Sequence, residues 1–183
     1  HCGLVLFAIL MMNQTACTGA VLQMLSHGLM TALFFALIGM IYGRTHTRDV
    51  RELSGLMKIM PFLAVCYVIA GLANLGLPGL SGFVAEMTIF NGAFQHADVF
   101  HRTWTIIACT SIVITAVYIL RLVGKILYGT CTNKHHLALP DATWDERTAV
   151  IILIVCVAGL GLAPLWISNM IGDSVLPLVS IFQ

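Results

Sequence analysis

One acidic side chain, Glu86, lies deep inside a long apolar stretch of the sequence, GLANLGLPGLSGFVAEMTIF at residues 71–90. The other acidic residues fall in polar loops or at the ends of apolar runs. An uncompensated charge at the centre of a bilayer costs about 2.5 to 3.5 kcal/mol on insertion scales. We therefore expect Glu86 to serve transport, by titrating a proton or pairing with an ion. The alternative is a purely structural pairing with another subunit.

A proline and three glycines that precede Glu86 predict a break in the helix that carries it. Pro78 lacks a backbone donor, and Gly76, Gly79 and Gly82 permit unwound backbone. Exposed carbonyl and amide groups at such a break tolerate water inside the membrane. A hydrated, discontinuous helix beside a carboxyl group is the arrangement with which transporters bind an ion or a proton near the bilayer midplane.

A histidine occupies a similar depth in the preceding apolar run. His27 lies roughly 14 Å from the predicted start of its helix at about 1.5 Å per residue, with Gln23 and Thr31 one turn to either side on the same face. Because free imidazole has a pKa near about 6.5, histidine accepts and releases a proton at low cost. This polar stripe favours a proton relay over the alternative of a packing histidine. His1, in the first apolar run, is a third candidate by position alone.

Two cations, Arg121 and Lys125, lie one turn apart in a later apolar run. Long basic side chains near a helix end can extend to the membrane surface while their stems stay in the apolar layer. We expect this arrangement for both, with ion pairing of Arg121 inside the bundle as the alternative.

The composition indicates an integral membrane protein. Of its 183 residues 59% are hydrophobic and only 9% are charged, against roughly 25% charged in an ordinary soluble domain. The net charge is +1, with the basic residues scattered along the chain. This pattern offers no electrostatic surface for nucleic acid.

The apolar runs predict an all-α, polytopic transmembrane helix bundle that forms a single domain over residues 1–183. A crossing of about 30 Å of hydrocarbon needs roughly 20 residues, which gives helices at 1–12 (partial), 19–42, 61–95, 104–128 and 148–171. The run 61–95 would be about 52 Å long as one straight helix, so we expect it to be broken near 76–82. Since the sequence begins within an apolar run, we expect it to be the C-terminal part of a larger subunit.

The basic residues predict the orientation of these helices. If consecutive helices alternate in direction, only Arg102 lies on one side of the membrane. The other side carries the remaining Lys and Arg, which are Arg44, Arg48, Arg51, Lys58, Arg121, Lys125, Lys134 and Arg147. Because positive charge accumulates on the inner side, loops 43–58 and 129–147 should face the cytoplasm or the mitochondrial matrix.

Sequence motifs for other chemistry are absent. There is no phosphate loop, no GxGxxG turn and no GxSxG elbow, so we expect no nucleotide, flavin or other cofactor in this chain. The pair His135–His136 has no third ligand at a metal-site spacing. We therefore expect no metal site.

Two stretches resemble one family, the antiporter-like proton-pumping subunits of respiratory complex I. These are GAVLQMLSHGLMTALFFALIGMIYGRTHTRDVRELSGL at 19–56 and GLANLGLPGLSGFVAEMTIF at 71–90. By this resemblance, His27 corresponds to the histidine of a central helix, His1 to the histidine of the preceding helix, and Glu86 to the charged residue on the discontinuous helix. Lysine is usual at that last position in sibling subunits and related antiporters, so glutamate points to one branch of the family.

The resemblance implies a proton-translocating subunit without redox groups. NADH, FMN, iron–sulfur clusters and a quinone would be bound by other subunits, and the partners would be sibling membrane subunits, lipid, protons and internal water. Protons would pass through His1 and His27 to Glu86. The location would be the bacterial plasma membrane or the mitochondrial inner membrane. A cation/proton antiporter subunit of the Mrp type and a purely structural membrane subunit remain the alternatives.

Overall fold

The computed structural model describes residues 1–129 and 139–180, and within them the regular structure is helical throughout. The helices are α1 (Cys2–Leu10), α2 (Gln14–Thr45), α3 (Leu56–Ile59), α4 (Pro61–Asn74), α5 (Ser81–Phe94), α6 (Val99–Leu127), α7 (Trp144–Leu162) and α8 (Leu165–Val179). The predicted all-α bundle with a discontinuous helix is confirmed.

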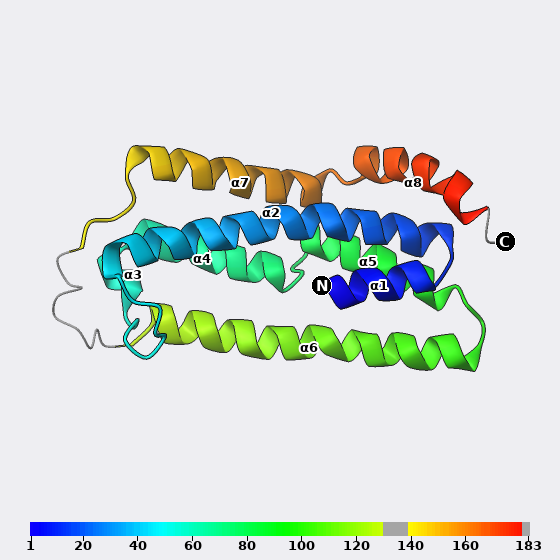
Figure 1. Cartoon of the computed structure of the whole chain (residues 1–183), viewed down its shortest axis with the longest axis horizontal. Helices are drawn as coiled ribbons and strands as arrows, with labels where there is room; N and C mark the ends of the chain where they lie inside the picture. Colours follow the sequence, from blue (N-terminus) through cyan, green and yellow to red (C-terminus); the bar gives the residue numbers. More distant parts are fainter. Residues whose placement is uncertain (130–138, 181–183) are drawn as a thin grey trace.

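The bundle is organised around α2. Figure 1 shows α4 and α5 end to end along α2. In this view α6 lies below these three helices, and α7 followed by α8 lies above them. The short helix α1 lies beside the half of α2 that α5 also covers. The middle of α2 therefore faces the junction between α4 and α5, where the sequence predicted the break.

The discontinuous helix is interrupted over residues 75–80. α4 ends at Asn74 and α5 begins at Ser81. Gly76 and Gly79 both adopt positive φ, at 66° and 95°, a conformation that costs little only for glycine. Gly82, which the sequence placed in the break, lies instead in the first turn of α5.

α2 begins five residues earlier than the predicted start at residue 19. The Asn13 side chain accepts a hydrogen bond from the backbone N–H of Ala16 at 2.7 Å and caps the helix. Its amide nitrogen also donates to the carbonyl oxygen of Gly92 on α5 at 2.6 Å. The polar residues between the predicted helices 1–12 and 19–42 therefore start α2 and attach it to α5.

The predicted helix 148–171 is divided into two helices, which together can form one broken span. α7 ends at Leu162, α8 begins at Leu165, and the two axes differ by 72°. Pro164 disfavours helical geometry in the residue before it, and Ala163 has φ −126° and ψ 60°. Residues 174–179, which lie beyond the predicted helix, belong to α8, which continues to Val179.

The other predicted limits differ by a few residues. α1 ends at Leu10 rather than at residue 12, and α6 begins at Val99 rather than at 104. Within the described residues, two helices, α2 and α6, are each long and apolar enough to cross a membrane. The bent pair α7 and α8 passes the same criterion together.

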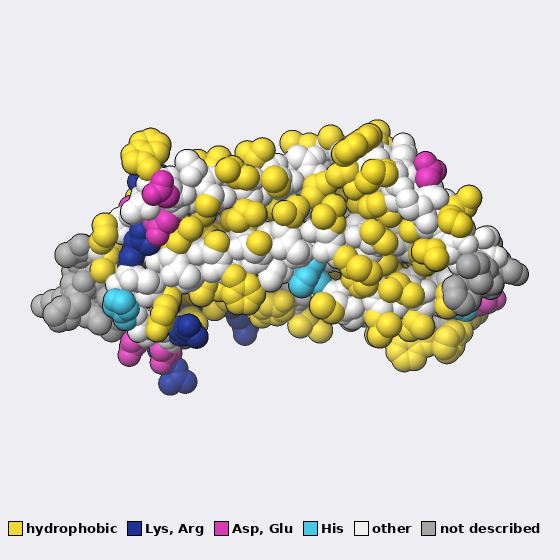
Figure 2. All heavy atoms as spheres, turned by 45° about the horizontal axis from the view of Figure 1, so that its top comes forward, with side chains coloured by type: hydrophobic (Ala, Val, Ile, Leu, Met, Phe, Trp, Pro, Cys, Tyr) yellow, Lys and Arg dark blue, Asp and Glu magenta, His cyan; other side chains and the backbone are white. Residues whose placement is uncertain are grey.

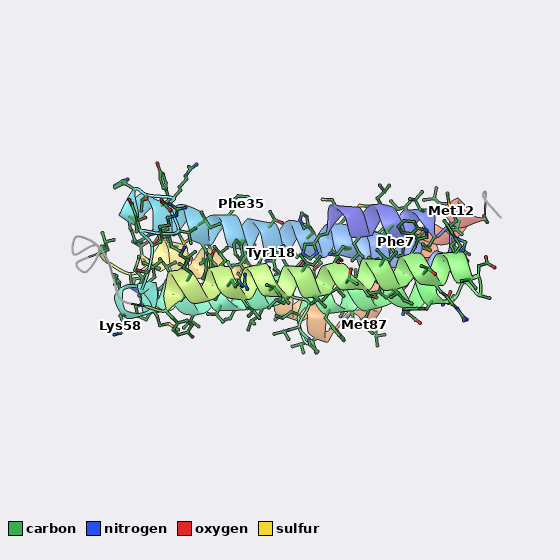
Figure 3. The ribbon with its side chains drawn as sticks, turned by 90° about the horizontal axis from the view of Figure 1, so that it is seen from below. Phe7, Met12, Phe35, Lys58, Met87 and Tyr118 are labelled. Atoms are coloured by element: carbon green, nitrogen blue, oxygen red, sulfur yellow. The ribbon has the colours of Figure 1, made fainter. Side chains whose placement is uncertain are left out.

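The surface of the bundle is largely apolar. Figure 2 shows hydrophobic side chains over most of one face, with charged side chains gathered at the end that contains α3 and the start of α7. Phe35 on α2 is 68% exposed and Met87 on α5 is 52% exposed, and Figure 3 shows them at opposite edges of the bundle. Such a surface fits a helix bundle whose surroundings are lipid.

The described residues of the two loops predicted to share one side, 46–55 and 139–143, lie at the same end of the bundle. Arg44, at the end of α2, donates from Nη1 to Oε1 of Glu146 on α7 at 3.2 Å and also pairs through Nη2 with Oε2. Its Nε donates to the carbonyl oxygen of Pro140 at 2.9 Å. Arg44 thus ties the end of α2 to the chain that leads into α7. Lys134 lies outside the described residues.

The helices α2 and α5 approach each other backbone to backbone. A β-carbon added at Gly19 would lie 2.7 Å from the backbone nitrogen of Ile89. One added at Gly92 would collide with the backbone of Ala16. Small residues at these contacts let dispersion forces act between the two main chains, which is one source of helix association in lipid.

We predict that Gly19→Ala lowers the stability of the bundle. The added methyl group meets backbone rather than a flexible side chain, so α2 and α5 must separate at a cost of roughly 1–3 kcal/mol. The measurement is the thermal unfolding midpoint of the full-length protein in detergent.

Gly39→Ala is the matched control on the same helix, because nothing lies within 4 Å of its added β-carbon. It should leave the midpoint unchanged or raise it slightly, since alanine favours helix. Equal midpoints for the two variants would contradict the close packing of α2 against α5.

Candidate functional site

Glu86 lies in the second turn of α5, beside the break between α4 and α5, and is 8% exposed. Its carboxyl group rests on the backbone of Gly76, because a β-carbon added there would lie 2.5 Å from Oε2 and 3.3 Å from Cδ. Gly76 also has the positive φ that turns the chain at this point. The break therefore creates the space for the carboxyl group as well as the unwound backbone beside it.

His1 meets Glu86 at this position. Its Nδ1 lies 3.6 Å from Oε1 of Glu86 and 2.7 Å from Nε2 of Gln23. Gln23 is fully buried on α2. One imidazole nitrogen is thus within reach of both a carboxylate and an amide, which come from two different helices.

His27 completes the group. Its ring centroid lies 5.5 Å from that of His1, with the two planes tilted by 43°. The structure therefore brings His1, Gln23, Glu86 and His27 into one cluster, which we call the relay cluster. Thr31 is half-buried one turn beyond His27 and takes no part in these contacts.

Two buried atoms of the relay cluster, His1 Nε2 and Gln23 Oε1, have no hydrogen-bond partner among the described residues. A buried polar atom left unpaired costs about 1–3 kcal/mol, and most such atoms in proteins are satisfied. The cluster is therefore poorly suited to serve stability alone. It retains one free donor or acceptor site on each of two side chains.

The amide of Gln23 can serve both protonation states of His1. With Nε2 directed at Nδ1, as in the structure, the amide donates to an unprotonated ring nitrogen. Rotated by half a turn, its Oε1 accepts from a protonated Nδ1. A proton can thus move between His1 and Glu86 while the amide remains paired in either state.

A further polar pair, not predicted from the sequence, lies next to the cluster. Ser26 on α2 donates to Oγ of Ser81, the first residue of α5, at 2.8 Å. Both side chains are buried. Ser26 stands one turn from Gln23, and this i, i+3 spacing is the only sequence signal that could have indicated it.

The remaining predicted residues lie elsewhere. Arg121 and Lys125 are exposed on α6, and neither forms an ion pair with an acidic side chain in the part of the chain that the structure describes. No group of three His, Cys, Asp or Glu side chains close enough to hold a metal ion occurs in residues 1–129 and 139–180. The pair His135–His136 lies outside the described residues.

Sequence comparison places this arrangement in a family. The pattern of the NADH:quinone oxidoreductase/Mrp antiporter transmembrane family matches residues 1–121, which contain the whole relay cluster. The chain belongs to this family. The match extends from α1 into α6, so the discontinuous helix and its acid lie within the family region.

Two similar proteins are named as subunits of quinone oxidoreductases. NAD(P)H-quinone oxidoreductase chain 4 1 of Synechococcus elongatus is 37% identical over 166 residues, 90% of this chain and 31% of that protein. NADH-quinone oxidoreductase subunit M of Rhodobacter capsulatus is 35% identical over 180 residues, 98% of this chain and 34% of that protein. The chain thus spans about a third of the length of these relatives.

A solved structure shows the same fold. A chain of respiratory complex I from Thermus thermophilus with bound NADH superposes with a TM-score of 0.85 and 24% sequence identity, covering 98% of this chain and 36% of that chain. Together with the apolar helices, the family match identifies the chain as an integral membrane protein.

We predict that Gly76→Ala displaces the Glu86 carboxyl group. The added methyl group would lie only 2.5 Å from Oε2, closer than two such atoms can approach, so the side chain must move away from the break. Dicyclohexylcarbodiimide, an apolar reagent for protonated carboxyl groups, should then modify Glu86 several-fold faster. Mass spectrometry of the full-length protein measures the rate.

Gly79→Ala controls for backbone strain. Gly79 also has positive φ, but the nearest atom to its added β-carbon is Cδ2 of Leu162 at 3.9 Å. It should leave the modification rate of Glu86 close to that of the unaltered protein. Similar rates for both alanine variants would show that Gly76 does not hold the carboxyl group in place.

Proposed function

We propose that this chain forms part of a proton-translocating membrane subunit of an NADH:quinone oxidoreductase, in which the relay cluster transfers protons within the bilayer. The observation that carries the proposal is the meeting of His1, Gln23, Glu86 and His27 at a helix break inside an apolar bundle. Family membership and the names of the relatives support it.

The chemistry of the cluster suits proton transfer. Histidine changes its charge near neutral pH at low cost, and Glu86 supplies a second titratable group 3.6 Å away. A mobile proton in the apolar bundle needs successive acceptors that are within hydrogen-bond reach or joined by water. The His1–His27 ring contact and the unwound segment 75–80 provide routes to and from this pair.

The driving force would come from outside this chain. We assign no redox group to it, so NADH oxidation and quinone reduction would take place on partner subunits that bind FMN and iron–sulfur clusters. Sibling membrane subunits would be its neighbours in the bilayer. The end of the bundle that carries Arg44, Arg48 and Arg51 would face the cytoplasm or the mitochondrial matrix, as positive charge favours the inner side.

Glu86→Gln tests the proposal most simply. Glutamine preserves the size of the side chain but cannot carry the proton, so we expect a several-fold lower proton-to-electron ratio in the assembled complex. Pumping is measured as acidification during NADH oxidation in sealed vesicles, and assembly by the yield of intact complex.

Glu52→Gln is the control, because this acid lies exposed in the loop after α2, where it accepts from the Thr47 hydroxyl at 2.9 Å. It should pump like the unaltered complex. An assembled Glu86→Gln complex with an unchanged proton-to-electron ratio would refute the role of Glu86.

The family also includes Mrp antiporters, so cation/proton exchange is the second candidate function. It requires no quinone reduction. Sodium-driven proton movement in vesicles without NADH, abolished by Glu86→Gln, would favour this second function over the first.

A further inference from the structure

An apolar cavity, which we call the loop cavity, lies at the end of the bundle that contains α3. It has a volume of about 180 Å³ and lies between α2, α4, α6 and the loop that follows α2. Figure 1 shows this loop, drawn in cyan, beside the C-terminal end of α6. The apolar side chains that line the cavity are Ile38, Ile41, Val50, Leu53, Leu122 and Ile126. Since an apolar cavity of about 150 Å³ takes up benzene, the loop cavity has room for roughly six carbons of a hydrocarbon chain.

A buried tyrosine gives the loop cavity a polar group. Tyr67 on α4 lines the cavity and is only 2% exposed. Its ring contacts that of Phe34 on α2, with the centroids 4.8 Å apart, but its hydroxyl forms no hydrogen bond with another described residue. A buried tyrosine hydroxyl usually has a partner. The Tyr67 hydroxyl is therefore free to donate to a molecule that occupies the cavity.

Arg48 places a positive charge at the opening of the loop cavity. Arg48 and Tyr42 both line the cavity and both are exposed, so the cavity reaches the surface beside them. The guanidinium carbon lies 4.5 Å from the centroid of the Tyr42 ring, in a cation–π contact. The two acids of the same loop, Asp49 and Glu52, form hydrogen bonds within the loop, and Arg48 forms no ion pair with either. The charge of Arg48 is therefore available to an anion.

The position of the opening matches the headgroup layer of a membrane. Charged side chains gather at this end of the bundle, and charge is costly inside the hydrocarbon. Tyrosine rings such as that of Tyr42 are enriched at the boundary between hydrocarbon and water. The loop cavity thus runs from the headgroup layer towards the hydrocarbon layer.

We propose that the loop cavity binds an anionic phospholipid. Part of one acyl chain fills the cavity, the phosphate group lies against Arg48, and an ester oxygen accepts a hydrogen bond from the Tyr67 hydroxyl. Arginine presents several N–H donors to phosphate, and basic pockets between transmembrane helices bind the head groups of anionic lipids. This inference goes beyond the proposed function and does not depend on proton transfer, because it needs only a bundle that lies in a bilayer.

The chemistry of the loop cavity favours lipid over other occupants. A helix of a partner protein is about 10 Å across and does not fit into this volume. A quinone has carbonyl groups for Tyr67 but no negative charge for Arg48. A phospholipid carries an anionic phosphate, ester oxygens and a hydrocarbon chain in sequence, as the cavity offers a cation, a hydroxyl and apolar walls. By occupying the space between α2, α4 and α6, the lipid would stabilise the folded bundle.

The test is a lipid titration of the full-length protein, delipidated in a neutral detergent and observed by native mass spectrometry. The probes are phosphatidylglycerol, which is anionic, and phosphatidylcholine, which has no net charge, with identical acyl chains. We expect one phosphatidylglycerol to bind several-fold more tightly than phosphatidylcholine. Arg48→Gln should weaken phosphatidylglycerol roughly fivefold, which corresponds to one basic side chain beside an anionic lipid, and leave phosphatidylcholine unchanged.

Arg51→Gln is the matched control for charge. Arg51 is exposed in the same loop but does not line the cavity, so this variant should bind phosphatidylglycerol like the unaltered protein. An equal loss for Arg48→Gln and Arg51→Gln would show general attraction to the loop and overturn the site. Equal affinities of the unaltered protein for the two lipids would also overturn it.

Tyr67→Phe tests whether the lipid enters the cavity. It removes only the hydroxyl, and because both lipids carry ester groups it should weaken both several-fold. Tyr118→Phe is the control, since Tyr118 is 53% exposed on α6 and does not line the cavity. Unchanged affinities in Tyr67→Phe would overturn the proposed lipid position. Glu86→Gln should bind phosphatidylglycerol like the unaltered protein, so its effect on pumping tests the proposed function separately.

Discussion

The contact between the Glu86 carboxyl group and the unwound backbone at Gly76 is the constraint on which the rest of the structure depends. A carboxyl group inside an apolar bundle needs polar neighbours, and a continuous helix offers none because its amides and carbonyls bond to each other. The break over 75–80 supplies the space for the carboxyl group, at Gly76. His1 and Gln23 then approach the acid from neighbouring helices.

Stability and the relay geometry rely on the same pair of helices. α2 carries Gln23, His27 and Ser26, while α5 carries Ser81 and Glu86. The glycine contacts that bring the two backbones together therefore also set the distances between the polar side chains. A serine hydroxyl pair or an amide–imidazole contact tolerates little separation, since hydrogen bonds weaken quickly beyond about 3.2 Å. Loose packing of α2 on α5 would disconnect the cluster.

Much of this arrangement could be predicted from the sequence, because the relevant signals are local. Pro78 with its glycines indicated the break, and the depth of Glu86 and His27 indicated a site. What could not be predicted depends on contacts between distant segments. The Ser26–Ser81 pair joins residues 55 positions apart. The bend at Pro164 was overlooked because the apolar run continues through it, and hydropathy does not distinguish one straight helix from two inclined ones.

The most direct test of a proton held and released at Glu86 is an infrared difference spectrum of the full-length complex between resting and turning-over states. Carboxyl-labelled glutamate would identify bands from glutamic acid, and Glu86→Gln would assign the band to this residue. The account predicts a carbonyl band of a protonated glutamic acid that changes during turnover and is missing in the variant. A spectrum in which no band sensitive to Glu86→Gln changes would contradict it.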